Sequence, residues 1–311
     1  MPLNPFETVS GPVALVPGLT PVNHAGYECL QLRNTHGTVI VSLHGGQVLS
    51  WTPAGQQDVF WLSSQAKPAP AAIRGGVPVC WPWFSKQGMP QGAMQHGPVR
   101  NVIWKLSACQ TGDNGAVLLS LEPDRTTSGG DAVDAYAEHL EVCLDIELGS
   151  SLRMALSTCN RGPEPFALTL ALHTYFAVGD VEQVQLQGVE GLRFDSRMEG
   201  THGKLQVGAF KLHTQCDNTY AQANQRAEHQ YLLMDPVWKR RISLRTLGSQ
   251  SCVVWNPGAD GAAAMADMPD AAWKDFLCVE AANAGPDVVI LAPGAQHQLQ
   301  QTLSCDVWPS A

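Results

Sequence analysis

The chain has 311 residues, of which 44% are hydrophobic and 15% charged, a globular composition with enough apolar residues for a sizeable core. The formal net charge is −9, and lysine and arginine form no run. This excludes the usual nucleic-acid-binding surface, because phosphate backbones are bound by clustered positive charge. An acidic protein can still bind a small anion where a few arginines converge.

The cysteines and the N-terminal sequence indicate a compartment. Nine cysteines are scattered singly, with no CxxC pair, which is typical of reduced thiols buried as small apolar residues. The N-terminal sequence lacks the basic start and long apolar stretch of a signal peptide. No segment approaches the roughly 20 apolar residues of a membrane helix. We therefore expect a cytoplasmic protein with no membrane or nucleic-acid partner.

Strand patterns follow one another along the chain, separated by Asn, Asp, Gly and Pro residues that favour turns. The strongest lies in residues 139–159, where apolar and polar residues alternate on both sides of Gly149-Ser150-Ser151 and so predict a hairpin with one buried face. In chain order, the other predicted strands are 38–43, 48–51, 116–121, 166–171, 184–187, 241–244, 252–255 and 288–291.

Few segments favour a helix. The best is Asp267–Phe276, which has a Pro/Asp start, and the Pro/Ala stretch Lys67–Ala72 reads as a surface loop. The sequence has no βαβ rhythm and no glycine-rich phosphate loop. Length alone allows one large β domain or two ordinary ones. We expect an all-β sandwich of antiparallel strands that forms a single domain over residues 1–311.

Three stretches are unusual for ordinary strands or turns. The first runs from Ile73 to Phe84, IRGGVPVCWPWF, in which adjacent glycines permit close backbone approach and three aromatic residues offer flat faces of the kind that pack on sugars. Its composition alone favours a buried loop packed on the core.

The second stretch, Gln95 to Arg100, reads QHGPVR. It places an amide, the imidazole of His96 and a guanidinium around a Gly-Pro turn. Arginine is shaped to bind phosphate through its donor fork, and Arg74 could join Arg100 in a local positive patch. Each arginine taken singly is more often a solvated surface residue or half of an ion pair.

The third stretch, PFALTLALHTYF, contains His173, whose ordinary pKa of about 6.5 suits it to proton transfer near neutral pH. Glu280 lies in the apolar run LCVEAA, where an unpaired charge is costly. Either residue by itself is as easily structural as catalytic. No metal-ligand spacing and no Gly-x-Ser-x-Gly elbow occurs, so we expect neither a metal nor serine-hydrolase chemistry.

Taken in order, IRGGVPVCWPWF, QHGPVR, ALHTYF, VVWNPG and CVEAAN resemble the motifs of the glucose-6-phosphate 1-epimerase family, the hexose-6-phosphate mutarotases within the aldose 1-epimerase superfamily. The resemblance covers most of the chain. It implies a large twisted β-sandwich of the galactose mutarotase-like supersandwich type, which interconverts the anomers of a hexose 6-phosphate without a cofactor or metal.

The resemblance also implies roles for individual residues. His173 and Glu280 match the catalytic residues, and the substrate-binding positions are matched by Arg74, Gln95, His96, Arg100 and Asp217. We expect a monomer that acts on a small sugar phosphate.

Two departures from the family pattern concern the site. Asn218 follows Asp217 where the family commonly has an arginine, and Pro98 replaces an aromatic residue. Two other functions stay open. One is an aldose 1-epimerase acting on unphosphorylated hexoses, and the other is a non-catalytic phosphosugar-binding β-sandwich.

Overall fold

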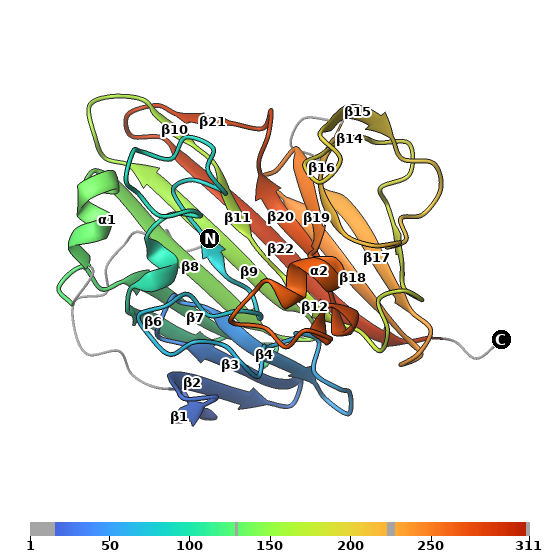
Figure 1. Cartoon of the computed structure of the whole chain (residues 1–311). Coiled ribbons are helices and arrows are strands. Elements are labelled where there is room, and N and C mark those ends of the chain that lie inside the picture. Colours follow the sequence, from blue (N-terminus) through green and yellow to red (C-terminus); the bar gives the residue numbers. More distant parts are fainter. Residues whose placement is uncertain (1–15, 128–129, 223–227, 309–311) are drawn as a thin grey trace.

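In a computed structural model, the described residues are 16–127, 130–222 and 228–308. Two large antiparallel sheets dominate (Figure 1). We call the first the support sheet. Its strands in spatial order are β13 (Gln185–Gln187), β17 (His229–Asp235), β18 (Arg240–Leu247), β22 (Gln296–Val307), β9 (Leu152–Asn160), β8 (Leu140–Leu148), β7 (Val117–Pro123) and β6 (Trp104–Thr111).

We call the second the site sheet. Its spatial order is β15 (Thr201–Leu205), β14 (Arg193–Ser196), β16 (Cys216–Ala221), β19 (Ser251–Asn256), β20 (Phe276–Asn283), β11 (Leu170–Leu172) and β5 (Val79–Cys80), and β12 (Tyr175–Ala177) also pairs with β20. The centre of this sheet lies on β22 of the support sheet, where β20 and β11 both contact it.

Smaller elements complete the described chain. A four-stranded sheet contains β1 (Leu19–His24), β2 (Tyr27–Asn34), β3 (Gly37–Ser42) and β4 (Val48–Pro53), and β10 (Phe166–Leu168) pairs with β21 (Val289–Leu291). The helices are short: α1 (Gly130–Ala137), α2 (Gly258–Ala263) and the 3-10 turns η1 (Val99–Asn101) and η2 (Ala272–Asp275).

The alternating pattern of the predicted hairpin is explained by the core. Strands β8 and β9 pair in register around Gly149, and their apolar residues Leu144, Leu148 and Leu156 are fully buried. Burying such side chains against a second sheet is the main force that holds a sandwich together. The predicted all-β sandwich is confirmed, and every predicted strand overlaps an observed one.

Two local predictions need correction. Residues 166–171 form two strands, β10 and β11, because the chain breaks at Thr169, whose amide bonds to the Pro82 carbonyl instead of a strand neighbour. The prediction of a helix over Asp267–Phe276 is wrong. Only η2 is helical there, and Phe276 already begins β20. The predicted surface loop Lys67–Ala72 is confirmed, since it is exposed or half-buried throughout.

Candidate active site

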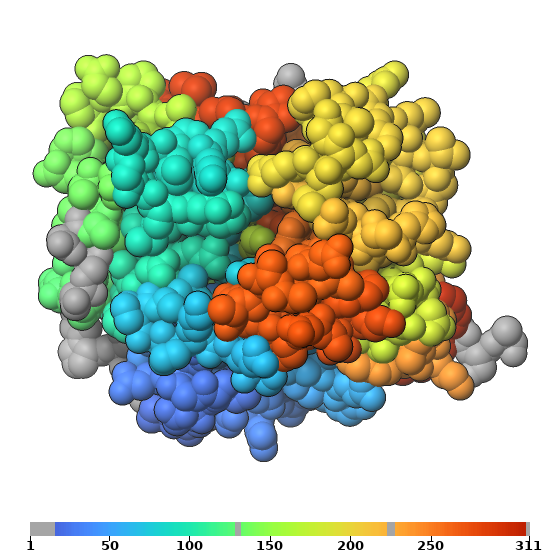
Figure 2. Space-filling view, viewed as in Figure 1, coloured from blue at the N-terminus to red at the C-terminus, as the bar shows by residue number. Residues whose placement is uncertain are grey.

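A cavity of about 510 Å³ opens on the face of the site sheet that points away from the support sheet. Figure 2 shows the hollow near the centre of the view, bordered by the teal loop around residues 80–100, the orange segment around α2 and the gold segment near residue 197. We call it the main cavity. It is lined by every residue that the sequence predicted for the site: Arg74, Gln95, His96, Arg100, His173, Asp217 and Glu280.

His173 and Glu280 are 107 positions apart, and strand pairing brings them together. Leu172 pairs with Ala281 and Tyr175 with Cys278, so the gap between β11 and β12 sets His173 opposite Glu280. Directly opposite residues of an antiparallel pair project from the same face. In the gap, the His173 amide donates to the carbonyl of Pro78, so the residue just before β5 helps to fix the histidine.

The two side chains face each other without a close hydrogen bond. His173 Nδ1 lies 3.4 Å from Glu280 Oε1, longer than an ordinary hydrogen bond. Neither this nitrogen nor either carboxylate oxygen has a hydrogen-bond partner among the described residues, although all three atoms are buried. Buried polar atoms are nearly always paired in folded proteins, so these three suit the hydroxyl groups of a polar ligand.

Burial governs the protonation of the pair. It raises the pKa of Glu280 well above its ordinary value, and the nearby Asp217 carboxylate raises it further, whereas Arg100 and Arg197 lower it. Burial also lowers the pKa of His173 well below its ordinary value, assisted by His96, Arg100 and Arg74. Burial therefore favours a neutral acid at Glu280 beside a neutral imidazole at His173.

His96 presents a defined tautomer to the cavity. Its Nδ1 accepts a hydrogen bond from the Ser85 amide at 3.2 Å. Burial, with Arg100, Arg74 and Arg197 nearby, lowers the pKa of His96 to about 3, so the ring is neutral and its proton sits on Nε2. The following Gly97 has φ +77°, and a Cβ there would lie 1.9 Å from the Trp81 carbonyl oxygen, so the turn requires glycine.

Arg74 is the most firmly held arginine of the site. Its Nε lies 3.2 Å from Asp267 Oδ2, and its Nη1 donates to the Tyr175 hydroxyl at 2.9 Å. The neighbouring Gly75 and Gly76 pass against the backbone of Trp61 and Val48, where a Cβ would collide. The glycine pair thus serves contact with the protein's own chain, and it fixes the arginine at the cavity wall.

Arg100, in η1, is less restrained. Its buried Nε has no hydrogen-bond partner among the described residues, and no carboxylate of those residues lies in ion-pair distance of it. A guanidinium with free donors in a cavity is a ready binding group for an anion. Gln95, on the same segment, donates to the Ser85 hydroxyl at 3.3 Å.

Asp217 obtains its cationic partner from a neighbouring strand. Arg197, just after β14, lies 3.2 Å from Asp217 Oδ2, and its amide bonds to the Asp217 carbonyl. Burial raises the pKa of Asp217, and Arg197 opposes that shift. Asp217 therefore has a cationic partner even though Asn218 replaces the arginine that the family commonly has at that position.

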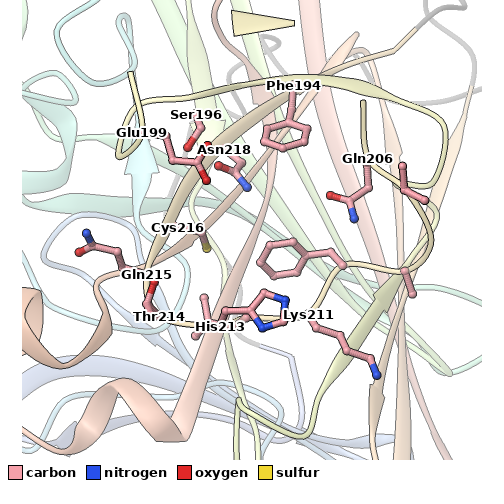
Figure 3. Close-up of a pocket in the computed structure, with 14 residues that line it drawn as sticks. Phe194, Ser196, Glu199, Gln206, Lys211, His213, Thr214, Gln215, Cys216 and Asn218 are labelled. Atoms are coloured by element: carbon pink, nitrogen blue, oxygen red, sulfur yellow. The ribbon is translucent and has the colours of Figure 1, made fainter. Parts of the chain in front are cut away.

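Strand alternation explains why position 218 cannot take part. Asn218 pairs with Ser196, and both line a second cavity of about 300 Å³ on the other face of β14 and β16. Figure 3 shows Ser196 and Asn218 among the residues around this second cavity. Asp217 and Arg197 point the opposite way, into the main cavity.

The aromatic residues of the site come from unexpected places. Trp81 and Trp83 are buried, and their indole nitrogens bond to Thr158 and to the Met94 carbonyl, so they support the loop and leave only Phe84 at the cavity. Trp255 supplies the other aromatic wall, with its ring centroid 5.9 Å from that of His173.

Sequence reasoning missed Arg197 and Trp255 as site residues. Arg197 lies in a turn without a motif, and the only signal was the aspartate at 217 that lacks its usual arginine. Trp255 lies within VVWNPG, a motif that marked the family and could have been assigned to the cavity wall.

Among residues 16–127, 130–222 and 228–308, no group of three or more His, Cys, Asp or Glu side chains could hold a metal ion. The helices of these ranges are all too short or too polar to cross a membrane.

The family model for aldose 1-epimerase matches residues 28–304. The chain belongs to this family. A Salmonella typhimurium relative named "Putative glucose-6-phosphate 1-epimerase" is 33% identical over 77% of this chain and 77% of its own length. A relative of the same name from the plant Cenchrus ciliaris is 30% identical over 90% of this chain and 85% of its own.

Solved structures agree with the fold. A crystal structure of a Salmonella typhimurium protein described as a putative mutarotase superposes with a TM-score of 0.82 at 30% identity, covering 95% of this chain and 96% of that one. A galactose mutarotase-like protein from Clostridium acetobutylicum has a TM-score of 0.69 at 14% identity, with 93% and 98% covered, and supports the fold alone. The predicted galactose mutarotase-like sandwich is confirmed.

Proposed function

We propose that this member of the aldose 1-epimerase family is a hexose-6-phosphate mutarotase, which interconverts the α and β anomers of glucose 6-phosphate or a related sugar. The observation that carries the proposal is the pair of buried, facing groups His173 and Glu280 in a cavity that three arginines also line. Cross-strand placement gives the pair a fixed separation, which acid–base catalysis at one carbon atom requires.

The reaction needs one proton to leave the O1 hydroxyl and one to reach the ring oxygen O5. Glu280 takes the O1 proton and His173 donates to O5, so the C1–O5 bond breaks and the aldehyde forms. After rotation about C1–C2, the O5 hydroxyl attacks the other face of C1, and both proton transfers reverse. Positioned acid–base catalysis contributes about 10²- to 10⁴-fold. No covalent intermediate with the protein is needed.

The protonation that burial favours suits this cycle. A neutral Glu280 and a neutral His173 together carry one mobile proton, the same number as a carboxylate beside an imidazolium. When a sugar binds with O1 at Glu280 and O5 at His173, the sugar hydroxyl stabilises the carboxylate and O5 accepts from the imidazolium. The substrate thereby selects the reactive form of the pair without any exchange with bulk water.

The arginines favour a phosphorylated sugar. In a hexose 6-phosphate, O5 connects C1 to C5, and C5 carries the C6 phosphate. With O5 at His173, the phosphate projects beyond His173, and Arg100 and Arg74 are the two cations that act on this histidine. Arg100 has a free buried donor, and the names of the relatives point to the same substrate.

Anomeric exchange measured by NMR tests the proposal, with glucose 6-phosphate and glucose as alternative substrates. We expect wild-type protein to accelerate exchange of the phosphorylated sugar at lower KM. Arg74→Ala or Arg100→Ala should raise that KM about 10-fold or more, the size of a charge-assisted hydrogen bond, and leave the rate with glucose nearly unchanged. Equal kinetics on both sugars would favour an aldose 1-epimerase of free hexoses, and binding without exchange would favour a phosphosugar-binding protein.

The setting of the enzyme is also part of the proposal. All nine cysteines lie within the described residues and are free, which supports a reducing, cytoplasmic location. A monomeric state and a single domain over residues 1–311 stay predictions.

A further inference from the structure

Arg197 joins two walls of the main cavity that come from distant parts of the chain. Its Nη1 lies 3.2 Å from Asp217 Oδ2 on the site sheet and 3.2 Å from Ser85 Oγ on the opposite loop. Ser85 is itself a junction. Its hydroxyl also accepts from Gln95, and its amide donates to His96. One guanidinium therefore connects the sheet wall to the loop that carries two other predicted site residues.

The charges of the cavity are arranged in two ends. Arg74 lies at the His173 end, where it lowers the pKa of that histidine, and Arg100 acts on both His173 and Glu280. Asp217 and Arg197 act on Glu280 at the other end, the carboxylate raising its pKa and the guanidinium lowering it. Strand pairing agrees with this division. Asp217 pairs with Trp255, and Val253, two residues earlier on the same face, pairs with Glu280.

The two ends meet different parts of the substrate. With O1 at Glu280 and O5 at His173, the bonded atoms O1, C1, O5, C5 and C6 of the sugar lead away from Glu280 to the phosphate. The Asp217 end then faces O1 and the hydroxyls of the ring, which are uncharged donors. An ionised carboxylate accepts such hydroxyls through both of its oxygens, whereas a protonated carboxyl group turns one oxygen into a donor. Burial opposes the ionisation of Asp217.

We propose that Arg197 is a positioning residue of the mutarotase reaction, which keeps the Asp217 carboxylate charged and directed at the sugar and does not bind the phosphate. This inference rests on the proposed function. The Arg197 side chain remains 62% exposed, so its contribution is moderated by solvent. Other charged or titratable groups at the cavity are Glu280 on β20, Arg100 in η1, Arg74, His96 and His173.

The test compares wild-type protein with Arg197→Ala and Arg197→Lys, using NMR exchange rates of glucose 6-phosphate across pH. For Arg197→Ala we expect kcat to fall about 5- to 20-fold while KM changes less than about 2-fold, because a hydrogen bond to a charged group is lost at the reacting end only. The acid limb of the pH profile should move to higher pH, since Asp217 loses a cation that lowers its pKa and so becomes protonated at a higher pH. Arg197→Lys should restore part of kcat and return the acid limb toward that of the wild type.

Arg193→Ala is the matched control, because Arg193 lies on β14, the strand that ends just before Arg197, and its Nη1 bonds to the Gly203 carbonyl outside the cavity. It should leave kcat, KM and the pH profile unchanged. A rise in KM for Arg197→Ala of the size expected for Arg74→Ala would overturn the inference by making Arg197 a phosphate ligand. Unchanged kcat, or a fall in kcat with an unmoved acid limb, would overturn it as well. A wild-type protein inactive on both sugars would contradict the proposed function itself.

Discussion

The support sheet and the site sheet divide the work of the molecule. In the support sheet, β8 alternates buried residues with exposed or half-buried ones at every position except Cys143, which is buried, as expected for a strand with one largely solvated face. In the site sheet, every residue of β20 is buried, and the neighbouring strand is broken at His173 between β11 and β12. A regular sheet provides stability. The site sheet is interrupted at His173 and buries the carboxyl group of Glu280. Burying this group lowers the stability of the fold but suits proton transfer.

The largest expected effect separates activity from stability in the site sheet. Glu280→Gln or His173→Ala should reduce catalysed anomeric exchange by about 10²- to 10⁴-fold. The free energy of unfolding should stay the same or rise for Glu280→Gln, because an unpaired buried carboxyl group is replaced by a neutral amide of the same shape. Exchange rates and urea unfolding on the same samples check this. Wild-type exchange in either variant would refute the assigned roles.

The opposite effect is expected in the support sheet. Leu156 on β9 is fully buried, so Leu156→Ala should lower the free energy of unfolding by about 2–5 kcal/mol. The fraction that remains folded should retain its kcat, because β9 contributes no residue to the main cavity. Denaturant unfolding measures the free energy of unfolding, and exchange rates divided by the concentration of folded protein measure kcat. A kcat loss as large as that of Glu280→Gln would show that the sheets are not separable in this way.

The strands of the support sheet were easier to predict from the sequence than β20 of the site sheet, for a physical reason. Alternation revealed β8 and β9, since the sequence of each alternates apolar and polar or small residues, although of the two only β8 has several exposed or half-buried positions. It could not reveal β20 as a strand, because a segment buried on both faces has no period of two. The site residues emerged only through ordered motifs. Arg197 did not emerge at all, since its partner Asp217 is reached through strand pairing and not through sequence spacing.

One hydrogen bond connects the two sheets behind His173 and Glu280. Thr174, next to His173, points the other way and donates to Gln301 Oε1 on β22 at 2.9 Å. Thr174→Val should cost about 1–3 kcal/mol by leaving the buried Gln301 oxygen without its donor. Thr174→Val combined with Gln301→Leu should recover much of that loss in urea unfolding. Additive losses would contradict the pairing.

The smallest expected effect is the dependence of the exchange rate on pH. At low pH, activity should fall when His173 and Glu280 together gain a second proton, which requires charging His173. Because the pKa of His173 is lowered, this fall in rate should occur below the ordinary histidine value of about 6.5. Removing the single proton requires ionising Glu280, whose pKa is raised, so the basic limb should lie above the ordinary glutamate value of about 4.3. Rates of exchange across pH should therefore form a broad plateau. A narrow optimum would contradict a pair held neutral by burial.

The opposite directions of Asp217 and Asn218 on β16 have a consequence for how this protein family can change over time. Inserting or deleting one residue within β16 would turn the asparagine into the main cavity and the aspartate into the second cavity, whereas a change of two would preserve both. Length variation among active relatives should therefore accumulate in the turns around β16 and occur within the strand only in even steps.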